Sequence, residues 1–368
     1  MEASFYQPIY LLITTSMAFF YGFRYLNSDG YSLQLQKNTF LAPLLISIVF
    51  IFWLGNRPIS GMYFGDTGNY ATSYALMGSE GNIHFDLHTE WVWYTIMLFS
   101  KQIGLNVHAF FTLIEAGYIL TVLWAVKRFM PTNPMLGMLF VFTALMFFTF
   151  GTNGLRNGLA CHIILLAISF FFDEKYIIGA ILCLTAFGIH RSTMLPIAGM
   201  FAGRFILTNL KWTIYFWVFS IFLSLALGGS IINFFASLGF DERMGSYNTS
   251  QYATSFSHTG FRWDFLLYSA MPILMGWYVC VKKKIKDDWY KALCITYTLC
   301  NAFWLMVITA AFSNRFAYLS WFMYPIVIAY PLINLPIWKD QDKKTGMILL
   351  AYSGFTLFMQ GFYWGALR

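Results

Sequence analysis

Long, continuous runs of apolar residues constrain this 368-residue chain more than any other feature of its sequence. Two examples are Trp212 to Leu238 and Thr345 to Phe362, and neither alternates between apolar and polar residues. A helix needs about 20 apolar residues to cross the hydrocarbon core of a bilayer, whereas a barrel strand needs only about 10 and alternates. Because a segment in lipid must satisfy its own backbone hydrogen bonds, these runs predict membrane-spanning helices.

The composition excludes a water-soluble protein. Hydrophobic residues make up 58% of the chain and charged residues only 11%, less than half of the roughly 25% that is usual in soluble domains. This excludes cytosolic enzymes, secreted disulfide scaffolds and nucleic-acid binders, so no nucleic-acid partner is expected. The five cysteines lie in or beside apolar runs without a C-x-x-C pair and are predicted to be small buried side chains. The fold class is therefore expected to be all-α, a polytopic integral membrane protein.

About twelve transmembrane helices are predicted in a single transmembrane domain, residues 1–368. They are expected near residues 5–23, 39–55, 106–126, 135–151, 155–172, 176–189, 193–208, 212–238, 263–281, 291–312, 316–336 and 345–365. The apolar stretch from Trp91 to Ser100 has only about ten residues before Lys101, too few to span a bilayer. Residues 91–104 are therefore predicted to form a half-helix or re-entrant element at the outer surface. Loops at about 56–90 and 239–262 are expected to face outward.

The distribution of Lys and Arg predicts the orientation, because both are enriched in cytoplasmic loops. The cluster Lys282, Lys283, Lys284 and Lys286 marks the cytoplasmic side, and every other Lys except Lys101 falls on the same side. The remaining outer basic residues are all arginines: Arg57, Arg156, Arg191, Arg243, Arg262, Arg315 and Arg368. Since a guanidinium is a planar fork that binds phosphate or carboxylate in a bidentate manner, the outer face is predicted to bind an anion.

Two predicted helices carry basic groups at their outer ends. Arg156, in the sequence Thr-Asn-Gly-Leu-Arg-Asn-Gly-Leu-Ala, either extends to the interface or binds an anion, which the free backbone N–H groups of a helix start also favour. His190 and Arg191 follow the other helix. A histidine at a helix end is more often structural than catalytic, but with an arginine beside it His190 is a candidate general base.

The outward loop 56–90 contains the candidate carboxylates. Asp66 either caps a turn or accepts a proton from a sugar hydroxyl, with Tyr70 and Tyr74 as surfaces on which a sugar stacks. Glu90, just before the short helix, is the second candidate. Glu115 lies mid-helix, and an ionisable residue inside a membrane is a functional candidate.

Further along the chain, Arg262 with Asp264, and Arg315 with Tyr318, stand at two more outer helix ends. Arg262 and Asp264 either form a local pair or leave the arginine to a ligand. No cluster of acidic residues suggests a metal site, so a metal-independent mechanism without a cofactor is predicted.

Taken in order, these fragments resemble the EpsG family of polysaccharide polymerases, the branch that includes many Wzy-type O-antigen and capsule polymerases. Asp66, Tyr70 and Tyr74 resemble the family's Asp followed by spaced tyrosines. The segment from Arg156 to Ala160 resembles its Arg-Gln-x-x-Ala helix start, with Asn157 where Gln is usual. The similarity extends from about residue 57 to 331 and includes the segments 189–192, 261–268 and 314–318.

The resemblance implies a GT-C-like polysaccharide polymerase architecture and a multi-pass protein of the bacterial inner membrane with its active site on the periplasmic face. Such a glycosyltransferase joins oligosaccharide repeat units carried on undecaprenyl diphosphate, and its partners are donor, acceptor, membrane lipid and a chain-length regulator protein. The expected catalytic residues are Asp66, His190 and Arg156. The expected substrate-binding residues are Arg191, Arg262, Arg315, Tyr70, Tyr74, Tyr318 and Glu90.

Two alternatives stay open on the sequence. An O-antigen ligase uses the same donor on the same face, but a large periplasmic insertion favours a ligase and the outer loops here are modest. A lipid-linked sugar flippase or transporter is expected to have charged residues around a midplane cavity and pseudo-repeated halves. Here the charged residues concentrate at outer helix ends instead.

Overall fold

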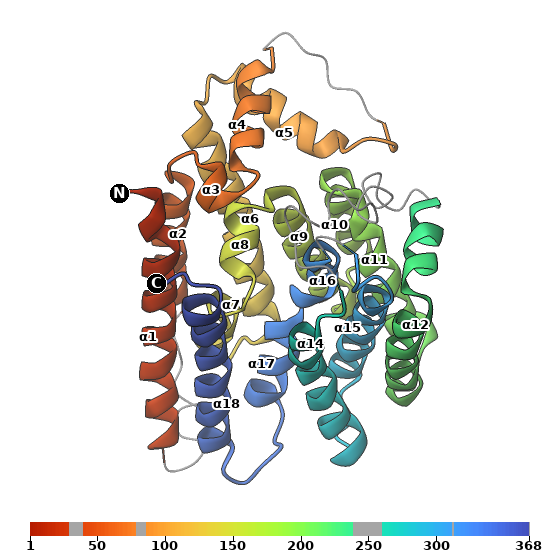
Figure 1. Ribbon diagram of the computed structural model, residues 1–368. Helices are drawn as coiled ribbons and strands as arrows, with labels where there is room; N and C mark the ends of the chain where they lie inside the picture. The colour runs from red at the N-terminus through yellow and green to blue at the C-terminus, as the bar shows by residue number, and fades with distance from the viewer. Residues whose placement is uncertain (29–39, 79–85, 238–259, 311–312, 368) are drawn as a thin grey trace. The chain divides into compact units, whose positions relative to one another are not determined.

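The computed structural model describes residues 1–28, 40–78, 86–237, 260–310 and 313–367 (Figure 1). Every regular element in these ranges is a helix, which confirms the all-α class. Arg243, Arg368 and almost all of the predicted loop 239–262 lie outside the described residues. The predicted loop 56–90 contains two helices in its described part: α3 (Gly61–Phe64) and α4 (Thr67–Leu76).

The chain divides into two compact units, each described here by itself: unit 1 comprises Met1–Arg191 and Ala329–Arg368, and unit 2 comprises Ser192–Ile328. The single transmembrane domain stays a prediction. Besides α3 and α4, the helices of unit 1 are α1 (Tyr6–Leu26), α2 (Leu41–Gly55), α5 (Trp91–Gln102), α6 (Val107–Phe129), α7 (Pro134–Phe142), α8 (Phe147–Thr152), α9 (Leu155–Phe172), α10 (Tyr176–Ile189) and α18 (Gln341–Thr356), which continues as the π-helix η7 (Leu357–Tyr363).

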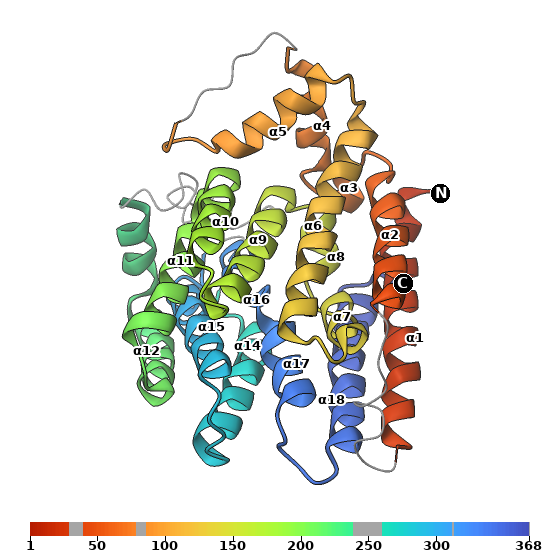
Figure 2. The same ribbon diagram turned by 180° about the vertical axis from the view of Figure 1, so that it is seen from behind.

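Helix α9 forms the centre of unit 1, and nearly all of its residues are buried. It packs against α6 and α10, while α2 packs on α6 and α1 packs on α18. Figures 1 and 2 show α4 and α5 at the end of unit 1 where α9 begins and α10 ends. The 12-residue helix α5 occupies the segment predicted as a half-helix, and it is not among the candidate membrane spans of the described residues.

The predicted span 135–151 is broken into α7 and α8. Backbone carbonyls near the break accept hydrogen bonds from side chains of other helices: Phe142 from Tyr10, Thr143 from Thr356, Leu145 from Gln360 and Phe147 from Tyr118. Non-helical backbone at membrane depth is tolerated where protein groups satisfy it. The break is therefore stable inside unit 1 although the sequence there is apolar.

Unit 2 is built around α15 (Asp288–Met306), which packs against all four of its larger neighbours. These are α11 (Met194–Phe201), α12 (Leu210–Ser237), α14 (Trp263–Gly276) and α16 (Asn314–Trp321). Buried side-chain hydrogen bonds join them: Trp217 Nε1 donates to Asn301 Oδ1 at 2.7 Å, and Asn301 Nδ2 donates to Ser320 Oγ at 2.9 Å. Helix α17 (Tyr324–Asn334) passes from unit 2 into unit 1.

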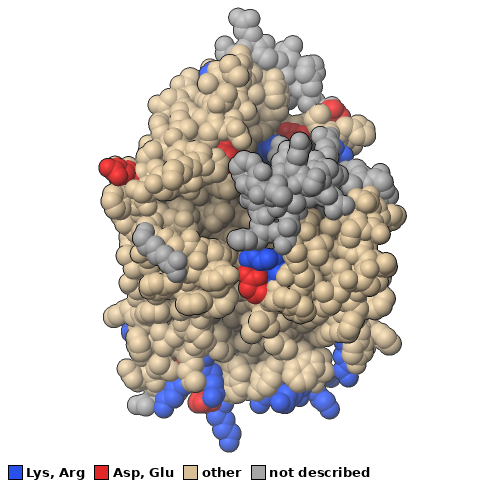
Figure 3. Space-filling view, viewed as in Figure 1, with Lys and Arg blue, Asp and Glu red and all other residues tan. Residues whose placement is uncertain are grey.

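Six stretches in the described residues are long and apolar enough to cross a membrane, so the count of about twelve is not confirmed. They are Val107–Phe129, Leu155–Phe172, Leu210–Phe234, Trp263–Lys282, Asn314–Asn334 and Gln341–Tyr363. Helices α2 and α10 are apolar but have only 15 and 14 residues. The face in Figure 3 has few charged side chains along its flanks, as a surface in contact with lipid requires.

Candidate active site

Three side chains from three helix ends of unit 1 meet at the carboxylate of Glu90. Glu90 immediately precedes α5, Arg156 lies in the first turn of α9, and His190 follows the last residue of α10. Arg156 Nη1 donates to Glu90 Oε2, and His190 Nδ1 lies 2.5 Å from Glu90 Oε1. Arg156 thus points toward a carboxylate in unit 1 instead of extending to the interface.

The local sequence explains why these three groups meet. Helices α9 and α10 are antiparallel and joined by a tight turn of three residues in which Glu174 has a φ of 60°. The start of α9 and the end of α10 therefore lie at the same end of the pair. At Gly188 a Cβ would lie 2.4 Å from Cγ2 of Val92, so only a glycine lets α5 approach α10 this closely. This approach brings Glu90 to the other two groups.

Helix α4 adds an aromatic wall beside Arg156. The Tyr70 hydroxyl accepts a hydrogen bond from Arg156 Nε at 3.4 Å, and the guanidinium carbon lies 5.6 Å from the centre of the Tyr70 ring. The Tyr70 ring also packs edge-to-face with Trp93, with ring centres 5.5 Å apart. We call Glu90, Arg156, His190 and Tyr70 the Glu90 cluster.

The charged side chains of the Glu90 cluster are partly exposed, at 20–26%. Burial acts to raise the pKa of Glu90, but the hydrogen bond from His190 and the charges of His190 and Arg156 outweigh it and hold this pKa below its ordinary value. Glu90 is therefore an anion at neutral pH. A carboxylate accepts and does not donate, so His190 Nδ1 carries a proton, and whenever the ring is neutral its basic lone pair lies on Nε2.

The predicted residues Asp66 and Tyr74 occupy different surroundings. The Asp66 side chain makes no cap for α4; its carboxylate accepts from Asn69 Nδ2 at 3.3 Å. Tyr74 is buried, stacks on Phe110 with ring centres 4.5 Å apart, and donates to the carbonyl of Leu105. The stacking role expected of Tyr74 does not fit this position, because packing inside unit 1 already covers its ring.

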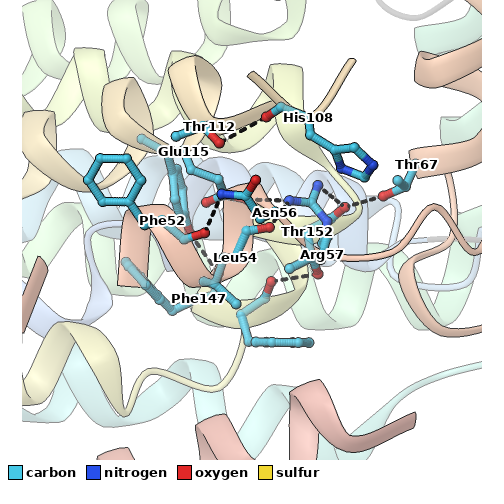
Figure 4. A network of polar contacts seen from close by, with 12 residues as sticks. Phe52, Leu54, Asn56, Arg57, Thr67, His108, Thr112, Glu115, Phe147 and Thr152 are labelled. Carbon is cyan, nitrogen blue, oxygen red and sulfur yellow. Dashed lines mark hydrogen bonds and ion pairs between the residues drawn. The ribbon is translucent and has the colours of Figure 1, made fainter. Parts of the chain in front are cut away.

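Arg57 and Glu115 form an ion pair that is completely buried (Figure 4). Arg57 Nη1 lies 2.9 Å from Glu115 Oε1, and the guanidinium also donates to the carbonyls of Leu54 and Thr152. The exposed fractions of Arg57 and Glu115 are both 0%. The prediction that the outer arginines bind an external anion is therefore wrong for Arg57, because burial removes it from solvent.

The remaining predicted groups are distributed over both units. Arg191 donates to the backbone carbonyl of His88 at 3.1 Å, just before α5. In unit 2, Arg262 makes a bidentate pair with Asp264 at 2.9 and 2.6 Å, which confirms the local pair. Arg315 is partly exposed near the start of α16. Tyr318 is buried, which leaves little of its surface for a substrate.

Sequence reasoning underestimated Glu90, which it treated as a secondary carboxylate, and it missed the partnership of Arg57 with Glu115. One signal in the sequence was available for the pair. Arg57 is a lone basic residue just after the apolar helix α2, and Glu115 is a lone acidic residue within α6, the next long apolar helix. Within the described residues, no three His, Cys, Asp or Glu side chains lie close enough to hold a metal ion. The metal-independent mechanism stays a prediction.

Comparison with known proteins identifies the family. The sequence matches the model of the EpsG family over residues 40–366, nearly the whole chain. No curated protein and no solved structure matches the sequence. The chain belongs to the EpsG family.

Proposed function

We propose that the protein is a polysaccharide polymerase that joins oligosaccharide repeat units carried on undecaprenyl diphosphate, at the outer face of the bacterial inner membrane. Membership of the EpsG family carries this proposal, because it suggests a polymerase-like glycosyltransferase. The six candidate spans agree with a substrate whose carrier is embedded in lipid.

The reaction sets two chemical requirements. A hydroxyl of the acceptor sugar attacks C1 of the donor sugar, and the bond between C1 and the diphosphate oxygen breaks. The hydroxyl proton must go to a base, and the departing diphosphate gains negative charge. A site for this reaction therefore needs a base beside the acceptor and a fixed cation beside the leaving group.

The Glu90 cluster offers both groups within one end of unit 1. His190 Nε2 takes the proton, while Glu90 orients the ring through Nδ1 and stabilises the imidazolium that forms, as the carboxylate does in a catalytic triad. Arg156 binds the diphosphate. Among the described residues its side chain donates only to Glu90 and Tyr70, so further N–H groups of the guanidinium remain for phosphate oxygens.

The other expected residues keep subsidiary roles in this proposal. Tyr70 presents an aromatic surface to the sugar, and Asp66 is the alternative base. Arg191, Arg262 and Arg315 are proposed to bind substrate, although the bidentate partner of Arg262 already neutralises its charge. Because neither base nor leaving-group cation is a metal in this scheme, the proposed transfer is metal-independent.

The test is polymerisation by purified protein in proteoliposomes, with a synthetic undecaprenyl-diphosphate oligosaccharide and EDTA present. We expect a ladder of products that differ by one repeat unit. Strict dependence on an added divalent cation would contradict the metal-independent scheme. Transfer only to a lipid A core acceptor would identify a ligase, and movement of substrate across the bilayer without new bonds would identify a flippase.

A further inference from the structure

Arg57 is the only completely buried arginine among the described residues, and its bonds reach three parts of unit 1. It donates to Leu54 at the end of α2, to Glu115 in α6 and to Thr152 at the end of α8 (Figure 4). Its charge has no contact with solvent, so this arginine acts on the protein and not on a ligand.

Thr152 and Asn153 accept three hydrogen bonds from the segment that follows α2, two at the Thr152 backbone carbonyl and one at the Asn153 side chain. Arg57 Nη2 donates to the Thr152 carbonyl at 3.0 Å, and Thr67 Oγ1 donates to the same carbonyl at 2.7 Å. The backbone N–H of Asp66 donates to Asn153 Oδ1 at 2.8 Å. The last carbonyls of a helix have no partner in their own helix, so Arg57 and Thr67 supply to the Thr152 carbonyl the bonds that α8 cannot make itself.

Two glycines permit these short contacts. A Cβ at Gly65 would lie 2.4 Å from Asn153 Oδ1, and this glycine has a φ of +51°. A Cβ at Gly151 would lie 2.9 Å from the Tyr118 ring and 3.4 Å from Glu115 Oε2. Gly65 directly precedes Asp66, and Gly151 directly precedes Thr152. The local sequence therefore permits close contact between the two segments.

The Thr152–Asn153 segment, which we call the Thr152–Asn153 junction, is close in sequence to residues of the Glu90 cluster. Three residues after Asn153 comes Arg156, and three residues after Thr67 comes Tyr70, which accepts from Arg156. The bonds at Thr152 therefore connect the two segments that supply these side chains. A shift of either segment would change where the guanidinium points.

We propose that Arg57, Glu115 and Thr67 are positioning residues that hold the Thr152–Asn153 junction and thereby fix Arg156 and Tyr70 in the Glu90 cluster. The catalytic consequence rests on the proposed function, but the positioning itself does not. Arg57 supplies the central bonds, Glu115 keeps it charged and in place, and Thr67 supplies the second donor to the same carbonyl.

The variant that tests this is Thr67→Val, which removes the hydroxyl and keeps the shape of a completely buried side chain. Thr67→Ser retains the hydroxyl and should therefore behave as the wild type. The matched control is Thr143→Val, because Thr143 is equally buried and, among the described residues, its hydroxyl bonds only the carbonyl of Leu139, four residues earlier in α7. These variants avoid Arg57 itself, whose loss would leave Glu115 as a buried, unpaired charge.

The first measurement is hydrogen–deuterium exchange of the peptide covering residues 149–158. We expect faster exchange in Thr67→Val than in wild type, and wild-type exchange in Thr67→Ser and Thr143→Val. Unchanged exchange in Thr67→Val, or the same increase in Thr143→Val, would overturn the proposal. This readout needs no substrate, so it decides the positioning even if the wild type forms no polymer and the proposed function fails.

The second measurement is the rate of polymerisation, where the wild type is active. Thr67→Val should lower kcat about ten- to a hundredfold with little change in KM for the donor, since small displacements of a positioned group reduce rate more than binding. In an Arg156→Lys background the same change should have a much smaller effect. Equal fold-losses in both backgrounds would show that Thr67 does not act through Arg156.

Discussion

At the scale of single residues, the Glu90 carboxylate holds the two cationic side chains of the candidate site before a substrate arrives. It bonds Arg156 through one oxygen and His190 through the other. In the proposed reaction, an anionic diphosphate that approaches Arg156 would therefore meet a guanidinium already oriented by a carboxylate. Such preorganisation lowers the free energy of the transition state because the site need not reorganise during the reaction.

The planar fork of Arg156 is expected to be essential. Arg156→Lys keeps the charge but loses the bidentate geometry, so kcat should fall about a hundred- to a thousandfold. Polymer length in cells, measured on gels at equal protein level, checks this. Arg128→Lys is the matched control, because Arg128 pairs with Asp173 at the other end of α9 and should retain long polymer. Undiminished length in Arg156→Lys would contradict the anion-binding role.

Glu90 has an expected pH signature. Because its pKa is held below the ordinary value of about 4.5, its bonds stabilise the folded protein above that pH, and this stabilisation is lost as the pH falls through the lower folded-state pKa. The Tm difference between wild type and Glu90→Gln should thus narrow below about pH 4.5. At neutral pH this variant should lose about a hundredfold or more in kcat. Asp173→Asn, which removes a carboxylate from the other end, should keep its activity.

The buried pair is expected to behave as a unit in stability measurements. Arg57→Met leaves Glu115 as an unpaired charge in the interior, which should destabilise unit 1 by about 3–5 kcal/mol. The double variant Arg57→Met/Glu115→Leu removes that charge as well and should recover most of the loss. Thermal unfolding in detergent checks both. Additive losses in the double variant would mean that the two side chains do not stabilise each other.

At the scale of elements, the helix pair α9 and α10 could be predicted from the sequence, and the break between α7 and α8 could not. Two apolar runs joined by Asp173, Glu174 and Lys175 can only reverse direction, so Arg156 and His190 had to share one end. The α7–α8 break depends on donors such as Tyr10 and Gln360, which come from α1 and η7. No local pattern in residues 135–151 indicates hydrogen-bond donors that are so distant in the chain.

Dependence on contacts between segments distant in the chain also explains why only some of the predicted site residues lie in the Glu90 cluster. Glu90 could be named as a candidate because it is a carboxylate beside a short helix. Its double pairing depends on how α5 packs against α10, a tertiary contact that includes Gly188 and that the sequence does not reveal. Tyr74 fits the family spacing, yet α4 turns that face of the helix toward Phe110.

The packing of α5 on α10 is itself testable. Gly188→Ala places a methyl group 2.4 Å from Cγ2 of Val92, so α5 must shift, which should destabilise the protein by about 1–3 kcal/mol and move Glu90 away from its partners. Activity and Tm should therefore both fall. Gly68→Ala is the matched control, because apart from the adjacent backbone of α4 no atom of the described residues lies within 4 Å of the added Cβ. If Gly188→Ala retains full activity, the placement of Glu90 does not depend on this contact.

At the scale of the whole molecule, unit 1 has two chemically different ends. The end opposite the Glu90 cluster carries the Arg128–Asp173 pair and the contact between Phe129 and Phe172, where α6 and α9 finish together. Lys127 and Lys175 lie at these helix termini, at the end of α6 and just before α10. Apart from Lys101, which bonds the Tyr74 carbonyl in α4, these lysines lie away from the cluster, as the positive-inside rule predicts for a cytoplasmic end.

This polarity predicts which end of unit 1 is reached from outside the cell membrane. In a background that lacks the five native cysteines, none of them exposed, His88→Cys beside α5 should react with a membrane-impermeant maleimide added outside. Lys175→Cys, at a residue that is also exposed in the α9–α10 turn, should react only after the membrane is permeabilised. Mass spectrometry of the labelled protein measures both. Because the lipid-linked donor and acceptor are proposed to be used on the outer face, the reverse labelling pattern would place the Glu90 cluster in the cytoplasm and refute both the orientation and the proposed site of polymerisation.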